Sequence, residues 1–190
     1  MSNQKKILSW FPALPLKQKT NFLRFLNYGR LGGTGKLVMY PVDQGFEHGP
    51  ARSFQKNPPG YDPRYHALLA IKSKCNGHAA PLGALEASAD IIAKYNLPVI
   101  LKTNNHDLML PDSKDHFPAT TSWVDDAVRL KAAAVGMTIY PGSSYAHEMY
   151  QRARELVADA RKAGLIVVIW AYPRGSGLPS NEAETALDVV

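Results

Sequence analysis

The stretch Leu37–Pro50 reads Leu-Val-Met-Tyr-Pro-Val-Asp-Gln-Gly-Phe-Glu-His-Gly-Pro, an apolar run that passes directly into a polar loop. The loop holds two acids, a histidine and two glycines. Parallel strands covered by helices read as continuous apolar runs, and functional polar groups collect at their carboxyl ends. Leu165–Ala171 repeats the pattern before Tyr-Pro-Arg-Gly at 172–175. We therefore predict two buried parallel strands that end at one rim.

The rest of the chain alternates between strand and helix patterns. Strands are predicted at 37–42, weakly at 77–80, and at 97–101, 135–140 and 165–171. Helices are predicted at 17–27, 62–74, 82–95, 122–133, 144–163 and 181–190. This α/β alternation implies a parallel sheet, either doubly wound or closed as a (β/α)8 barrel, and periodicity does not separate the two. Five strands fall short of a barrel, which takes about 250 residues, so we expect an incomplete unit.

Composition narrows the class of protein. The 190 residues are 45% hydrophobic and 20% charged, which is enough for a buried core in one domain. The net charge of +6 is spread along the chain, so nucleic-acid binding is not expected, whereas anionic substrates are. The single Cys75 indicates a reducing compartment and a small buried side chain. No segment reaches the roughly 18–20 apolar residues of a membrane span, so a cytoplasmic location is predicted.

Two tempting motifs do not hold. Gly-Gly-Thr-Gly-Lys at 32–36 resembles a phosphate loop, but Arg30 replaces the first glycine, Leu37 replaces the Ser or Thr, and the motif precedes its strand. His106 and His116 share a loop without metal-ligand spacing. Neither a metal nor a cofactor is therefore predicted. Residues 1–42 carry seven Lys or Arg and no acid, and we interpret residues 1–35 as a helical lead-in rather than a targeting peptide.

The strand ends supply candidate site residues. Asp43 can orient substrate or exchange protons, or it can simply cap a loop. Trp170 and Tyr172 share one face of their strand, where the Tyr172 phenol can transfer protons and Trp170 can equally be core. Arg174 can bind an anion or be a solvated surface residue. Lys102 can pair with phosphate or, if desolvated, form a Schiff base.

Five motifs together resemble one family, the archaeal and bacterial DhnA-type class I fructose-1,6-bisphosphate aldolases. The motifs are Leu-x-Gly-Thr-Gly-x-Leu from 31, Pro-Val-Asp-Gln-Gly-x-Glu-His-Gly from 41, Val-Ile-Leu-Lys-Thr-Asn from 99, Val-Gly-Met-Thr-Ile-Tyr-Pro-Gly-Ser from 135 and Ile-Trp-Ala-Tyr-Pro-Arg-Gly from 169. The resemblance implies a (β/α)8 TIM barrel, of which residues 36–190 would form about five βα units. It also implies a metal-free Schiff-base mechanism assisted by Asp43, Trp170 and Tyr172, with His48 and Arg174 as substrate contacts. Lys102 is added as a substrate-binding candidate because of its place at the end of a predicted strand.

The chain departs from this family in one respect. The family's Schiff-base lysine lies on the sixth strand, which the predicted five-strand unit does not contain, so residues 1–190 alone are expected to be inactive. The full-length form is expected to act on a sugar phosphate and to be a homo-oligomer. One alternative is another Schiff-base enzyme of the superfamily, acting on a different phosphorylated sugar or ketoacid. The other is a non-catalytic binding or assembly fragment.

Overall fold

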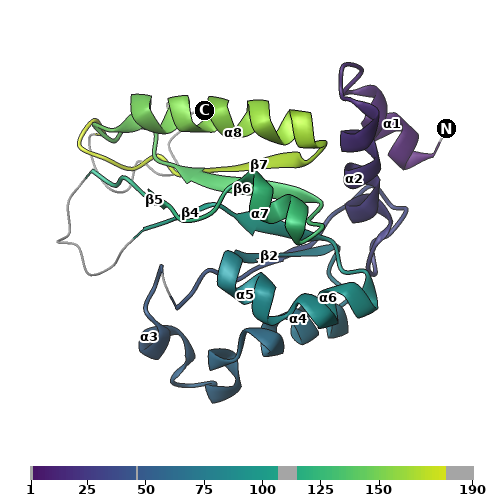
Figure 1. Cartoon of the computed structure of the whole chain (residues 1–190), viewed down its shortest axis with the longest axis horizontal. Coiled ribbons are helices and arrows are strands. Elements are labelled where there is room, and N and C mark those ends of the chain that lie inside the picture. The colour runs from purple at the N-terminus through teal and green to yellow at the C-terminus, as the bar shows by residue number, and fades with distance from the viewer. Residues whose placement is uncertain (1, 46, 107–114, 179–190) are drawn as a thin grey trace.

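The computed structural model describes residues 2–45, 47–106 and 115–178 and is built around a five-stranded parallel sheet (Figure 1). Its strands are β1 (Met39–Pro41), β2 (Gly77–Pro81), β3 (Val99–Lys102), β6 (Ala134–Ile139) and β7 (Ile166–Ala171). They lie side by side in chain order, and every neighbouring pair is parallel. A doubly wound sheet would reverse its strand order at a switch point. The one-directional order therefore makes this a sector of a barrel, as expected.

The helices lie at the periphery of the sheet. They are α1 (Asn3–Ser9), α2 (Leu16–Asn27), α3 (Pro50–Phe54), the 3₁₀ helix η1 (Pro58–Tyr61), α4 (Pro63–Lys72), α5 (Leu82–Ala87), α6 (Ala89–Tyr95), α7 (Val124–Arg129) and α8 (Ala146–Ala163). α4 and α5 pack beside β2, and α8 packs along β6 and β7 (Figure 1). Among the described residues, no helix combines the length and apolar character needed to cross a bilayer.

Side-chain alternation gives the sheet two different faces. The outer face packs on the helices through a large apolar cluster that includes Val99, Leu101 and Val135. The inner face carries a smaller cluster centred on Phe25, Ile100 and small alanines. Because successive side chains in a strand point to opposite faces, polar residues two positions beyond the inner cluster also point inward.

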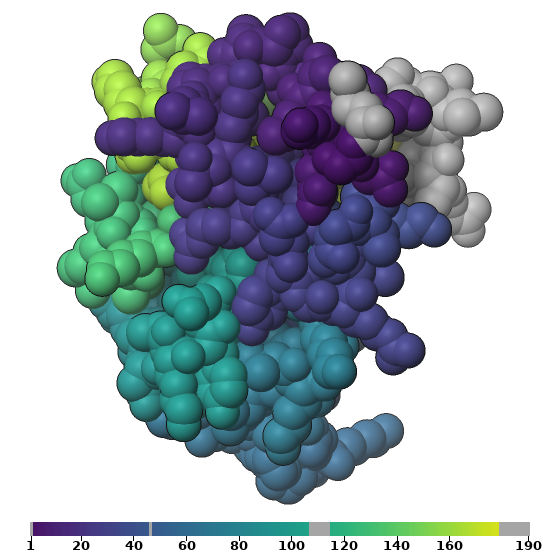
Figure 2. Space-filling view, turned by 90° about the vertical axis from the view of Figure 1, so that its right-hand side faces the viewer, coloured from purple at the N-terminus to yellow at the C-terminus, as the bar shows by residue number. Residues whose placement is uncertain are grey.

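The lead-in closes the amino-terminal end of the inner face. Phe25 of α2 is buried against the inner cluster. Two amides of α2 fix its position, since Gln18 donates to the Leu165 carbonyl and Asn21 donates to the Gly164 carbonyl. Figure 2 shows this amino-terminal segment spread over one side of the molecule. The predicted helix at 17–27 is thus confirmed, and it packs at the amino-terminal end of the inner face.

Several predicted boundaries are wrong. The strand predicted at 37–42 contains only Met39–Pro41. Val38 is 51% exposed, because among the described strands β1 pairs only with β2. The strand predicted weakly at 77–80 is confirmed as β2, which is largely buried between β1 and β3. The helix predicted at 82–95 divides at Ser88. The helix predicted at 122–133 contains only Val124–Arg129, and Ser122 lies outside it with its hydroxyl donating to the Lys102 carbonyl.

Other predictions are confirmed by the structure. The helices predicted at 62–74 and 144–163 are present as α4 and α8. Asp62 caps α4 by accepting from the Arg64 amide, and Gly164 ends α8 in the left-handed region. Cys75 is buried, and burial raises the pKa of its thiol. The long loop after β3 contains a short antiparallel pair, β4 (Asn104–Asn105) and β5 (Ala119–Thr120). The helix predicted at 181–190 lies outside the described residues.

Candidate functional site

A cavity of about 390 Å³ opens on the inner face at the carboxyl ends of the strands. It is lined by Pro41, Val42, Asp43, Gln44, Glu47, His48, Ala79, Lys102, His106, His116, Thr138, Tyr140, Trp170, Tyr172 and Arg174. The lining includes acids, cations and phenols from strands far apart in the sequence. Its volume falls within the range usual for small-molecule sites.

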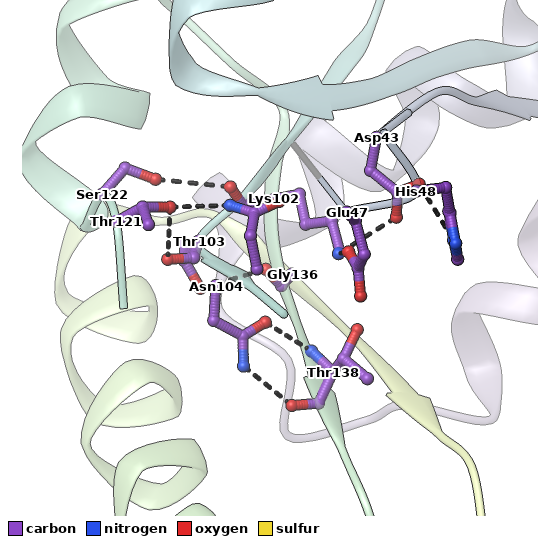
Figure 3. Close-up of polar contacts among 11 residues, drawn as sticks. Asp43, Glu47, His48, Lys102, Thr103, Asn104, Thr121, Ser122, Gly136 and Thr138 are labelled. Carbon is purple, nitrogen blue, oxygen red and sulfur yellow. Dashed lines mark hydrogen bonds and ion pairs between the residues drawn. The ribbon is translucent and has the colours of Figure 1, made fainter. Parts of the chain in front are cut away.

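The centre of the cavity is an ion cluster around Lys102 (Figure 3). Lys102 is only 5% exposed, and its ammonium Nζ lies 3.0 Å from Asp43 Oδ2. It also contacts the carboxylate of Glu47, which is itself 6% exposed. Burial lowers the pKa of Lys102, and the charge of Asp43 and its hydrogen bond oppose that shift. The cluster therefore joins one cation to two carboxylates in a largely dry pocket.

The loop after β1 brings both acids to the same cation. Val42 donates its amide to the Ala79 carbonyl, so the backbone stays aligned with β2 up to Asp43. The Glu47 amide then donates to the Asp43 carbonyl at 3.3 Å, which closes a turn. Gly45, with a φ of 109°, supplies a conformation within this turn that other residues rarely adopt. Acids four residues apart thus converge on Lys102.

The backbone on the other side of Lys102 is equally well held (Figure 3). The side chain of Asn104 makes two 2.8 Å hydrogen bonds, from Nδ2 to the Thr138 carbonyl and from the Thr138 amide to Oδ1. The Thr103 amide donates to the Gly136 carbonyl. These bonds tie the end of β3 to β6, so the Lys102 backbone has little freedom.

The end of β7 contributes a more open group of residues. The ring of Trp170 lies against Gly136, where an added Cβ would be 2.9 Å from its Cη2. Tyr172 is 41% exposed. The Arg174 guanidinium lies 5.1 Å from the Tyr172 ring centroid and 5.8 Å from that of Tyr140, distances typical of cation–π contacts. Burial raises the pKa of Tyr140, so this phenol stays protonated.

Three histidines line the entrance. His48 Nε2 lies 3.9 Å from Asp43 Oδ1, and the rings of His106 and His116 meet edge to face at 4.6 Å. Asp115 accepts hydrogen bonds from the amides of Ser144 and Ser176, which joins the loops after β3, β6 and β7. Within the described part of the chain, no group of three or more His, Cys, Asp or Glu is arranged to hold a metal ion.

All six residues proposed from sequence line this one cavity, although their roles remain predictions. They are Asp43, His48, Lys102, Trp170, Tyr172 and Arg174. Sequence analysis did not assign a role to Glu47, Tyr140 or either His106 or His116. The signal for Glu47 was present, since an acid four residues after Asp43 in a glycine-containing loop can turn back toward the same site. Nothing in the sequence alone pointed His106 and His116 inward.

A one-directional parallel barrel sector with a buried lysine–carboxylate cluster at its carboxyl rim has the architecture of a (β/α)8-barrel enzyme. Comparison with known families gives a match to DeoC/LacD family aldolase over residues 37–188. That match covers most of the chain, which therefore belongs to the DeoC/LacD aldolase family.

Individual relatives agree with the family. The chain is 39% identical over 163 residues to a probable fructose-bisphosphate aldolase class 1 of Chlamydia trachomatis, covering 85% of the chain and 46% of the relative. It is 33% identical over 184 residues to a fructose-bisphosphate aldolase/6-deoxy-5-ketofructose 1-phosphate synthase of Methanocaldococcus jannaschii, covering 90% and 56%. The chain thus spans about half the length of these relatives.

A solved structure gives the same result in three dimensions. It is an archaeal fructose-1,6-bisphosphate aldolase whose catalytic lysine is covalently bound to the carbinolamine intermediate of the substrate. The TM-score is 0.72 at 32% identity, and the match covers 90% of this chain and 63% of that one. The five-stranded unit therefore corresponds to a part of a TIM barrel.

Proposed function

We propose that this chain forms the first five βα units of a class I, Schiff-base fructose-bisphosphate aldolase. The supporting observation is the convergence of Asp43, Lys102 and Tyr172 on one cavity at the carboxyl rim. The reaction is the reversible cleavage of fructose 1,6-bisphosphate to dihydroxyacetone phosphate and glyceraldehyde 3-phosphate, as in glycolysis and gluconeogenesis. The imine nitrogen would come from a sixth-strand lysine, as the family resemblance implies.

The residues of this chain supply the acid–base and binding groups for that reaction. Cleavage of the carbon–carbon bond requires a proton to leave the hydroxyl of the cleaved carbon, and Tyr172, acting as a phenolate, accepts it and becomes the phenol. Asp43 provides negative charge beside the protonated imine, which acts as the electron sink. Trp170 forms the wall beneath the sugar. Arg174 and His48, at the open side, bind an anionic phosphate group.

A second candidate function is favoured by the archaeal relative named both as aldolase and as 6-deoxy-5-ketofructose 1-phosphate synthase. The same groups would serve such a reaction, because its named product is also a phosphorylated keto sugar. A direct comparison of the two substrate sets in one assay separates the candidates. We favour fructose 1,6-bisphosphate because the chlamydial relative is more similar over most of the chain.

The proposed setting follows from the substrate. We propose a cytoplasmic homo-oligomer that acts on sugar phosphates and binds neither nucleic acid nor membranes. The pairing of β1 and β7 on one side only, within the described residues, is consistent with a unit that needs further elements to complete its barrel.

The test uses residues 1–190 joined to the sixth to eighth βα units of a relative such as the chlamydial protein. We expect cleavage of fructose 1,6-bisphosphate that survives a chelator and is abolished by borohydride in the presence of substrate, because reduction traps the imine. Residues 1–190 alone should show neither cleavage nor a trapped substrate adduct. Chelator-sensitive cleavage without trapping would contradict the Schiff-base assignment.

A further inference from the structure

Lys102 combines two features that act in opposite directions. It is buried in a cavity that we assign to a carbonyl substrate. A neutral amine there would compete with the imine-forming lysine for the carbonyl carbon. Yet its ammonium group is held by two carboxylates, those of Asp43 and Glu47. Only a neutral amine attacks a carbonyl, so the balance between burial and these charges decides its reactivity.

Glu47 is the more deeply buried of the two acids that contact Lys102. Its side chain is 7% exposed and contacts Nζ directly, whereas the Asp43 side chain is 25% exposed at 3.0 Å. A buried charge is screened less by solvent, so Glu47 favours the ammonium form more than an exposed acid would at the same separation. Asp43 has two neighbours, His48 at Oδ1 and Lys102 at Oδ2, whereas Oε2 of Glu47 contacts Lys102.

The remaining groups do not replace Glu47 in this balance. The other titratable side chains that line the cavity are His48, His106, His116, Tyr140, Tyr172 and Arg174. When charged, the histidines and Arg174 are cations, which disfavour an ammonium ion nearby. Tyr140 is kept neutral by burial. The carboxylates of Asp43 and Glu47 are thus the groups among the described lining residues that support the charge on Lys102.

We propose that Glu47 is a positioning residue that holds Lys102 as an ammonium ion and so prevents Lys102 from competing for the carbonyl carbon of the substrate. This rests on the proposed function in that the cavity takes a carbonyl compound. Within that function, the sixth-strand lysine that the family resemblance implies forms the imine. Lys102 remains a fixed positive charge beside Asp43.

Reductive ethylation reads the charge state of Lys102 in the chain itself. The neutral amine attacks the carbonyl carbon of acetaldehyde, a C–N bond forms, and water leaves to give the imine. Cyanoborohydride then delivers hydride to the imine carbon, and solvent supplies the proton that completes the secondary amine. Acetaldehyde carries no phosphate, so the result does not depend on which sugar phosphate the protein uses.

The experiment compares residues 1–190 as wild type, Glu47→Gln and Glu47→Asp, with ethylation of each lysine followed by peptide mass spectrometry. The exposed Lys72 is the internal reference. Gln has the size of Glu without its charge, so access to Lys102 is unchanged. We expect the Lys102 rate relative to Lys72 to rise at least about tenfold in Glu47→Gln, equivalent to one unit of pKa. Glu47→Asp should stay close to wild type.

An unchanged Lys102 rate in a folded Glu47→Gln variant, judged by circular dichroism, would overturn the proposal. If that variant does not fold, Glu47→Met, which is close to Glu in size and also uncharged, should raise the rate in the same way. No increase there would equally overturn it. If ethylation rises but residues 1–190 joined to the sixth to eighth βα units of a relative fail to cleave fructose 1,6-bisphosphate, the role of Glu47 stands and the proposed function falls.

Discussion

The carboxyl ends of β3 and β7 contribute to one cavity in contrasting ways. β3 lies between β2 and β6, and its last residue, Lys102, is buried in a network of ions and backbone hydrogen bonds. β7 pairs only with β6 among the described strands, its Ile169 is 38% exposed, and Tyr172 just beyond it is 41% exposed. The central strand holds a fixed charge, and the outer strand presents groups that can meet a ligand.

This contrast follows from strand position. A strand with neighbours on both sides is surrounded by packed side chains, so a polar group at its end must find protein partners. A strand at the margin leaves its end partly hydrated, so its groups can exchange partners during a reaction. The comparison predicts that changes at β7 affect turnover and that changes at β3 affect stability.

The largest effect is expected at the β7 end. In the protein that joins residues 1–190 to the sixth to eighth βα units of a relative, Tyr172→Phe should lower turnover by about 10²- to 10⁴-fold, the usual contribution of positioned acid–base catalysis. Imine trapping by borohydride should persist. Steady-state cleavage rates and adduct yield provide the measurement. Tyr150→Phe, at an exposed tyrosine of α8, is the control. Near-normal turnover in Tyr172→Phe would mean that the phenol is only a packing group.

A smaller but clear effect is expected at the β3 end. Lys102→Met removes the cation shared by two carboxylates and should lower the free energy of unfolding by about 3 kcal/mol, because a buried charge is left unpaired. Adding Glu47→Gln should restore at least half of the loss. Urea unfolding of residues 1–190 measures both, with the exposed Lys72→Met as control. Equal losses in the single and double variants would contradict the pairing.

The outer face of β2, which lies between β1 and β3, extends the comparison to the pH dependence of stability. His78 is buried, donates from Nδ1 to the Tyr40 carbonyl at 2.8 Å and stacks on the Tyr40 ring. Burial lowers the pKa of His78 to about 4, so the folded state binds its proton less readily than the unfolded state does. Its contribution to stability is therefore complete above pH 6.5 and is lost as the pH falls toward 4.

Between pH 7.5 and 4.5 this loss amounts to roughly 2–3 kcal/mol. Urea unfolding at the two pH values should show it in the wild type. His78→Asn, whose amide can still donate to the Tyr40 carbonyl, should reduce the pH dependence by about that amount, whereas His147→Gln at an exposed position should not. An unaltered pH dependence in His78→Asn would show that other groups carry it.

Much of the site was predictable because its residues sit next to readable strands. Asp43 follows an apolar run, and Trp170 and Tyr172 alternate along another, so period two alone placed both on one face. Length was less predictable. The strand predicted at 37–42 is too long because the prediction treats its apolar residues as covered on both faces. In the structure Leu37 and Val38 are exposed. Residues 82–95 have one helical pattern but form two helices.

The alternation of strands and helices, the family and the strand ends that carry chemistry could all be read from the sequence, because they depend on local periodicity and on residue types at fixed spacing. The direction of strand order, which makes the sheet a barrel sector, and the partners of Lys102 became known from the three-dimensional structure. Both depend on contacts between distant segments. Lys102 and Glu47 are 55 positions apart, and whether a lysine is a nucleophile or a paired cation depends on burial and charges that its neighbours in the chain do not specify.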